Sequence, residues 1–118
     1  KPLHSTCIGK VMLGSLKPAD LSALFKKQPL NKVTSSTITA QSRLVEDLAA
    51  STERGYFMTR GENVADVTAI AVPVRVNNEL LGLAVAGPSN RMDPQLDRHV
   101  QRLLEAQRRL RKEGIATV

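Results

Sequence analysis

The sequence lacks several residues and patterns on which common classes of protein depend. Its 118 residues include a single cysteine, Cys7, no tryptophan, and few aromatic residues of any kind. One cysteine excludes a framework of internal disulfides and is compatible with a reducing compartment. No apolar run approaches the ~18 to 20 residues of a membrane-spanning helix, and no signal peptide is visible. We therefore expect one domain with an aliphatic core and no membrane partner.

Motifs for catalysis and for cofactor binding are also missing. His4, Cys7 and His99 do not have the spacing of zinc ligands. Neither of the two glycine-rich phosphate-binding motifs occurs, and the pair Gly9-Lys10 alone carries no weight. We therefore expect no metal, no cofactor and no catalytic residues. Cys7 lies near the expected start of a helix, which can lower the pKa of a thiol. It is either a nucleophile or, as we favour, a small residue in the core or in a pocket wall.

Positive charge is in excess, with 17 Lys and Arg residues against 11 Asp and Glu residues and a net charge of +6. Six of the 17 basic residues lie between Arg98 and Lys112, on an expected helix. Modules that bind nucleic acids usually combine such charges with aromatic side chains that stack on bases. Because the aromatic residues are few and lie elsewhere, we interpret the cluster as a solvated helix face.

The order of helical and extended patterns predicts an α+β domain with a mainly antiparallel sheet flanked by helices. The expected helices run from Ser5 or Thr6 to Leu13, from Pro18 to before Pro29, from Ala40 to Arg54, and from Pro94 to before Gly114. Thr39 and Asp93 are expected to cap the last two helices, and Gly14 to end the first. The expected strands cover residues 56–60, 67–76 and 79–88. Since these strands are few for so many helices, we expect further strands to precede Lys1.

The segment from Val67 to Pro88 is predicted to be a hairpin with two different faces. Asn77 and Asn78 suit a two-residue turn, because asparagine tolerates positive φ. Alternation places large side chains on one face, namely Ile70, Val72, Val74, Val76, Leu81, Leu83 and Val85. The other face carries Ala69, Ala71, Pro73, Gly82, Ala84 and Ala86. A sheet face with such small side chains either lets a helix pack closely against it or leaves room for a ligand. Glu62, in the preceding loop, is either a turn residue or a functional acid.

Three stretches, taken in order, form a fairly specific pattern. They are PLHSTCIGKVML near the start, Glu53-Arg54-Gly55-Tyr56, and IAVPVRVNNELLGLAVAGPSNRM. Together they resemble the C-terminal effector-binding domain of IclR-family transcription regulators, which has a GAF-like fold. The resemblance extends in order over essentially all 118 residues.

The resemblance implies a ligand-sensing domain and not an enzyme. Family members are bacterial cytoplasmic dimers or tetramers, in which a separate N-terminal winged helix-turn-helix domain binds DNA. Residues 1–118 would be the effector-binding domain, without its opening helix and first strands and without the DNA-binding domain. Two other interpretations stay open: a small cysteine-dependent enzyme, and a GAF-like dimerisation module with a closed and empty pocket.

The resemblance also implies which residues contact the effector. They are Cys7, Ile8, Thr59, Glu62, Ala69, Ala84 and Ala86. The backbone amides of Cys7 and Ile8, at the start of a helix, would meet an anionic ligand. The three alanines offer no side-chain hydrogen bond where relatives that bind small acids tend to be polar, and Thr59 replaces a usual acid. We therefore expect a larger or more apolar effector, such as an aromatic acid. Asp66 replaces a usual glycine, which leaves the loop conformation open.

Overall fold

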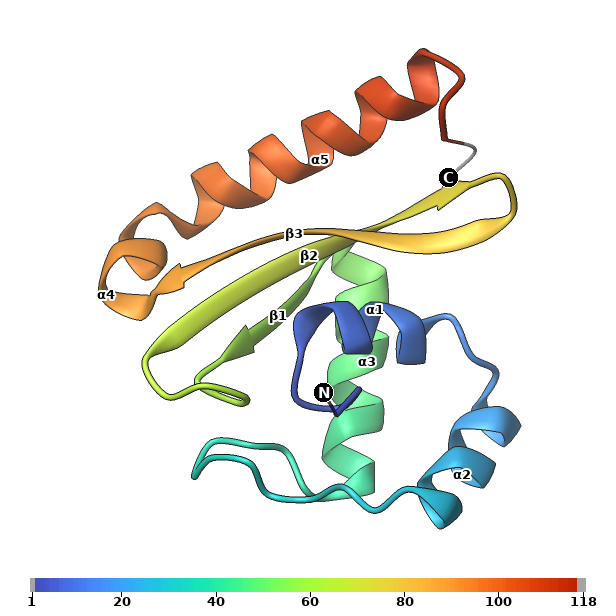
Figure 1. Ribbon diagram of the computed structural model, residues 1–118, viewed down its shortest axis with the longest axis vertical. Coiled ribbons are helices and arrows are strands. Elements are labelled where there is room, and N and C mark those ends of the chain that lie inside the picture. Colours follow the sequence, from blue (N-terminus) through green and yellow to red (C-terminus); the bar gives the residue numbers. More distant parts are fainter. Residues whose placement is uncertain (1, 117–118) are drawn as a thin grey trace.

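An antiparallel sheet is the centre of the protein, as seen in a computed structural model that describes residues 2–116 (Figure 1). Within those residues the sheet has three strands in the order β1-β2-β3. Their bounds are Phe57–Arg60 for β1, Val67–Val76 for β2 and Glu79–Pro88 for β3. The turn between β2 and β3 has positive φ at both Asn77 and Asn78, at 51° and 66°, as the sequence predicted. The strands of the hairpin are therefore in the expected places.

Helices cover both faces of this sheet. They are α1 (Cys7–Gly14), α2 (Pro18–Lys27), α3 (Gln41–Arg54), α4 (Ser89–Met92) and α5 (Leu96–Lys112), with a 3-10 turn at Asp93–Gln95 before α5. Figure 1 shows α5 across one face, and α1 and α3 on the other side. The predicted α+β class is confirmed. Among residues 2–116, none of the helices combines the length and the apolarity that a bilayer-crossing segment requires.

The register of the hairpin confirms its two faces. Directly opposed residues share a face of an antiparallel sheet, and the large residues oppose one another, for example Ile70 and Val85. Ile70 is fully buried and belongs to a core cluster with Met92 of α4 and Val100 of α5. The large face of the hairpin therefore packs under α5.

The small face packs against α1 in one half and leaves open space in the other. Near Gly82, α1 approaches so closely that a Cβ atom on this glycine would lie 3.0 Å from Ile8 Cδ1. Ala71 is fully buried in a second cluster, which includes Cys7 and Val11 of α1 together with residues of α2 and α3. Further along the hairpin, around the opposed pair Ala69 and Ala86, space is left open. Both alternatives raised by the sequence thus occur, at different ends of the same face.

Three predicted helix ends are wrong. Gly14 lies inside α1, and Ser15 is the C-cap. A Cβ atom at position 14 would come within 2.7 Å of the Phe57 ring, so only glycine fits there. Ala40, not Thr39, is the N-cap of α3, and it makes no side-chain capping bond. Asp93 does not cap α5, because its carboxylate accepts a hydrogen bond of 2.9 Å from the buried hydroxyl of Thr68. Of the two predicted caps of α1, Ser5 and Thr6, Thr6 is the cap, and its hydroxyl accepts from the backbone amide of Gly9 at 3.1 Å.

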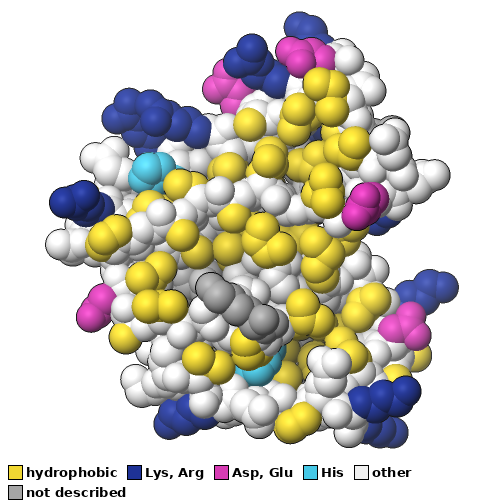
Figure 2. All heavy atoms as spheres, in the orientation of Figure 1, with side chains coloured by type: hydrophobic (Ala, Val, Ile, Leu, Met, Phe, Trp, Pro, Cys, Tyr) yellow, Lys and Arg dark blue, Asp and Glu magenta, His cyan; other side chains and the backbone are white. Residues whose placement is uncertain are grey.

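The surface separates apolar from basic regions. Figure 2 shows hydrophobic side chains gathered in the middle of one face, with Lys and Arg towards its edges. The six basic residues from Arg98 to Lys112 are all exposed on α5, as the interpretation of a solvated helix face requires. Ile8 and, on the edge strand β3, Leu81 are exposed large apolar residues at 37% and 43%.

Candidate functional site

A cavity of about 180 Å³ opens on the small face of the sheet, beside the first turn of α1. Its lining comes from α1 and its cap, β1, the 61–66 loop, β2 and β3, and consists of Thr6, Cys7, Ile8, Thr59, Asn63, Val64, Val67, Ala69 and Ala86. Ligand pockets are typically apolar with a few placed polar groups. Here the polar side chains are two threonines and one asparagine, and no lining residue in the described part of the chain is charged. The cavity therefore favours a compact, mainly apolar ligand.

The structure brings together five of the residues that the sequence singled out. Cys7, Ile8, Thr59, Ala69 and Ala86 all line the cavity, although they come from four different elements. They meet because α1 crosses the small face and because β1 pairs with β2, with Thr59 opposite Ala69.

Two of the expected pocket residues lie outside the cavity lining. Ala84 is on the same face but one pair further along the hairpin, opposite Ala71, and is exposed. Glu62 precedes the lining residue Asn63, but its carboxylate turns away to contact Lys10. Its other oxygen accepts from the backbone amide of Arg60 at 3.0 Å, which is the turn role that the sequence left open.

The Cys7 thiol is a poor nucleophile in this setting. Burial raises its pKa, although the backbone amides of Ile8 and Cys7 and the charge of Lys10 act in the opposite direction. A neutral thiol reacts slowly, since the thiolate is the nucleophilic form. Cys7 therefore contributes volume and a weakly polar surface to the cavity.

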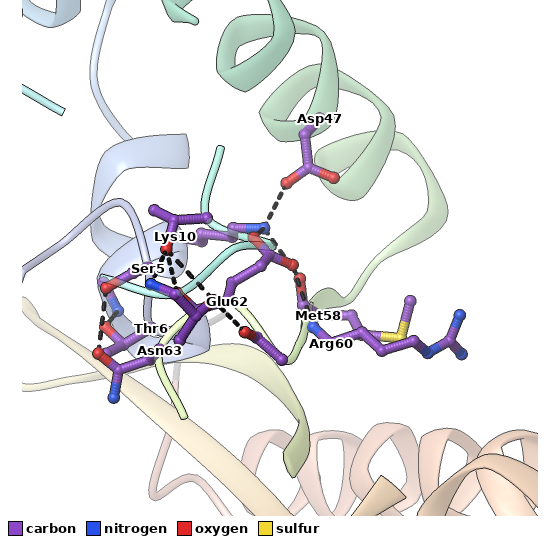
Figure 3. A network of polar contacts seen from close by, with 12 residues as sticks. Ser5, Thr6, Lys10, Asp47, Met58, Arg60, Glu62 and Asn63 are labelled. Carbon is purple, nitrogen blue, oxygen red and sulfur yellow. Dashed lines mark hydrogen bonds and ion pairs between the residues drawn. The ribbon is translucent and has the colours of Figure 1, made fainter. Parts of the chain in front are cut away.

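Lys10 is the residue of this region that the sequence did not reveal. Its side chain is completely buried, and its Nζ lies 2.8 Å from an Asp47 oxygen and 2.7 Å from a Glu62 oxygen (Figure 3). It also donates to the Met58 carbonyl at 3.0 Å. The one available signal was a lysine within the otherwise apolar helix CIGKVMLG. Its acidic partners lie 37 and 52 residues further along the chain, so spacing could not connect them.

The loop that closes one side of the cavity is held by side chains. Ser5 donates to the Asn63 side chain at 3.2 Å, and Thr37 donates to the Glu62 carbonyl at 2.6 Å. Asp66 adopts a φ of 61°, the left-handed conformation that favours glycine and that aspartate tolerates. The conformation of the loop, which the sequence left open, is thus compatible with aspartate at this position. Within residues 2–116, no three His, Cys, Asp or Glu side chains are arranged to hold a metal ion.

The sequence profile described as "Bacterial transcriptional regulator IclR C-terminal" matches residues 1–112. The chain belongs to this family. Two curated IclR-type relatives are the HTH-type regulators BhcR of Paracoccus denitrificans and XynR of Escherichia coli. BhcR is 33% identical over 92% of this chain, and XynR is 37% identical over 62%. The chain spans 40% of the length of BhcR and 29% of XynR.

Solved IclR-type structures have the same fold. The inducer-binding domain of PobR from Acinetobacter, a double mutant in complex with 3-hydroxybenzoic acid, is 29% identical with a TM-score of 0.85. That match covers 94% of this chain and 66% of the other. The C-terminal domain of E. coli KdgR is 30% identical with a TM-score of 0.81, over 92% and 68% of the two chains. An IclR homologue from Microbacterium hydrocarbonoxydans in complex with 4-hydroxybenzoate is 28% identical with a TM-score of 0.66, over 75% and 37%.

These comparisons confirm the GAF-like α+β class and the assignment as an IclR effector-binding domain. Such domains bind small-molecule effectors in transcription regulators that also have DNA-binding domains. The family consists of regulators and not of enzymes, so the cysteine-dependent enzyme is excluded.

Proposed function

We propose that this domain senses an aromatic acid of about the size of a hydroxybenzoate, in the cavity between α1 and the small face of the sheet. The observation that carries the proposal is the volume of about 180 Å³ with an uncharged and mainly apolar lining. An apolar cavity of about 150 Å³ holds one benzene ring, so one substituted ring suits this space. PobR and the Microbacterium homologue, which share the fold, are complexed with hydroxybenzoates.

The chemistry of the lining indicates how such a ligand would lie. Its carboxylate would face the backbone amides of Cys7 and Ile8, where the positive end of the α1 dipole stabilises negative charge. Its ring would pack on Ala69 and Ala86, and Thr59 is available for a hydroxyl substituent. The absence of a lining cation among the described residues makes apolar contact the larger part of the affinity.

In the whole protein, we propose that effector binding shifts a conformational or oligomeric equilibrium coupled to a separate winged helix-turn-helix domain. Such coupling requires a different affinity of the effector for the two states. The HTH-type names of BhcR and XynR support this arrangement. We propose that residues 1–118 belong to one effector-binding unit.

We propose that the whole regulator is a cytoplasmic homodimer or homotetramer. Leu81, an apolar residue on the large face of the sheet that stays exposed, supports a further partner at this end of the hairpin.

Calorimetry and thermal shift measurements with matched ligands test the proposed effector class. 3-Hydroxybenzoate, 4-hydroxybenzoate and benzoate are expected to bind and to raise the melting temperature, whereas pyruvate and acetate are not. Ala86→Leu fills the cavity and is expected to weaken binding by at least about tenfold, the effect of losing ~1.4 kcal/mol. Ala84→Leu adds the same side chain to the same face outside the lining, and should bind as the original protein does. A response to the short acids alone would overturn the aromatic class, and no response to any acid would favour a closed dimerisation module.

A further inference from the structure

Lys10 brings a full positive charge into the interior beside the cavity. Its side chain has no exposed area, while those of Asp47 and Glu62 are 27% and 12% exposed. A buried ammonium group is stable only when it is paired and hydrogen-bonded. Lys10 meets that need with two carboxylates and the Met58 carbonyl. One carboxylate would suffice to neutralise the charge, so a second contact can serve to position the segment that carries it.

The two carboxylates come from different parts of the fold. Asp47 lies in α3, a regular helix of 14 residues that holds its own position. Glu62 lies in the 61–66 loop, outside the helices and strands. Backbone hydrogen bonds tie the ends of this loop, from Gly61 N to the Val67 carbonyl and from Ser89 N to the Asp66 carbonyl, each at 2.8 Å, so Glu62 anchors its middle. Figure 3 shows both side chains converging on the Lys10 ammonium from opposite sides. The pair with Glu62 therefore ties an irregular segment to the rigid α1.

The tied segment is a wall of the cavity. The two residues after Glu62, Asn63 and Val64, both line it. Val64 is 51% exposed, so packing alone holds this part of the wall weakly. Of the polar contacts that anchor the segment, the pair between Lys10 and Glu62 is the one between full charges, at 2.7 Å. Segments with few buried contacts open locally at low energetic cost. We therefore expect this charged anchor to set how often residues 61–66 open away from the cavity.

We propose that Lys10 is a positioning residue that, through Glu62, holds Asn63 and Val64 against the cavity and so sets effector affinity. The proposal rests on the proposed function of the cavity, because it gives Lys10 a role in ligand binding. Lys10 does not touch the ligand itself. It acts through the loop, which must be in place for the cavity to enclose an effector.

Glu62→Gln and Asp47→Asn form a matched pair for the test. Each removes one negative charge, keeps the side-chain shape and leaves Lys10 one carboxylate. Only Glu62→Gln weakens the charged anchor of the loop, since Asp47 lies in α3 and not in the loop. Hydrogen–deuterium exchange is measured on both variants without ligand, and calorimetry with 4-hydroxybenzoate follows. In Glu62→Gln, amides of residues 61–66 are expected to exchange about tenfold faster while those of β2 are unchanged. Its 4-hydroxybenzoate affinity is expected to fall about fivefold, and Asp47→Asn should match the original protein in both measurements.

The outcomes separate this proposal from the function of the cavity. Equal exchange of residues 61–66 in both variants and the original protein overturns the positioning role, even if 4-hydroxybenzoate binds. A rise in exchange throughout the protein, β2 included, shows a merely structural role and also overturns it. If the original protein binds no hydroxybenzoate, the proposed function fails and the exchange data still decide whether Lys10 positions the loop. Should Glu62→Gln not fold, the double variant Lys10→Met/Glu62→Gln removes the cation with its partner, and slow loop exchange in that variant overturns the proposal.

Discussion

A lysine within the hydrophobic core is tolerated at position 10 because its ammonium group contacts two carboxylates and a backbone carbonyl. Its neighbours in α1, Val11 and Leu13, are buried apolar residues, so this part of the helix belongs to the core. The stem of a lysine can cover apolar surface while the ammonium group reaches polar partners. The residue thus serves both packing and charge pairing.

Lys10→Met tests the strength of this arrangement. The substitution keeps the apolar stem but leaves Asp47 and Glu62 close together without a cation. Breaking a buried ion pair by removing one partner typically costs about 3–5 kcal/mol, and we expect about 3 kcal/mol because Asp47 keeps some solvent contact. Urea unfolding measures the loss. Lys26→Met, at an exposed position of α2, should change stability by less than ~0.5 kcal/mol. A loss below about 1 kcal/mol for Lys10→Met would contradict the buried pairing.

The Cys7 thiol gives the domain a pH dependence at alkaline pH. Burial raises its pKa in the folded protein, so the unfolded chain loses this proton first as pH rises. The stabilisation from the neutral thiol is complete below the unfolded pKa of about 8.5 and is lost as pH rises towards the folded value. We therefore expect the stability difference between the protein and Cys7→Ala to shrink above pH ~8.5. Urea unfolding of both proteins between neutral and alkaline pH measures it. A stability difference between the two proteins that grows with pH would show that folding lowers the pKa of Cys7 instead.

At the scale of elements, local patterns predicted most of what is observed. Period-two alternation identified both faces of the β2–β3 hairpin, since side chains on a strand must alternate. The left-handed turn at Asn77 and Asn78 followed from the tolerance of asparagine for positive φ. The start of α5 could not be predicted, because Asp93 is used by Thr68, a partner 25 residues away. That Glu62 and Ala84 lie outside the cavity lining depends on where α1 and the loop lie in three dimensions, which local patterns do not fix.

The uncapped start of α3 offers a gain in stability. Ala40 occupies the N-cap position with φ of −90° and ψ of 124°, but its side chain cannot accept a hydrogen bond. Ala40→Asp provides an acceptor and a favourable charge at the helix start, and should stabilise the protein by about 1 kcal/mol. Thermal unfolding measures the increase. Thr39→Ala should have little effect, since Thr39 is not the cap. A larger loss from Thr39→Ala than the gain from Ala40→Asp would show that the helix begins one residue earlier.

At the scale of the molecule, the sheet separates two core clusters. One lies under α5 around Ile70, and the other joins α1, α2 and α3 around Leu44. The sequence predicted this α+β class because apolar stripes on the helices require a sheet face to cover them. It could not predict the cavity itself. The cavity exists because α1 lies close to the sheet at Gly82 and farther from it near Ala69, and this tilt depends on the packing of the whole fold.

The hairpin has a further consequence for how such a regulator can change over evolution. Each strand carries core residues on one side and cavity residues on the other, so Ile70 and Ala69 are neighbours in sequence but not in their surroundings. If the cavity binds the effector as proposed, a substitution at Ala69 or Ala86 would alter what it recognises without touching the packing under α5. Ala69 also packs against the cluster of α1, α2 and α3, whereas Ala86 is exposed and belongs to neither cluster. Under the proposed function, Ala86 is therefore the position at which a single mutation would change effector recognition with the least effect on folding.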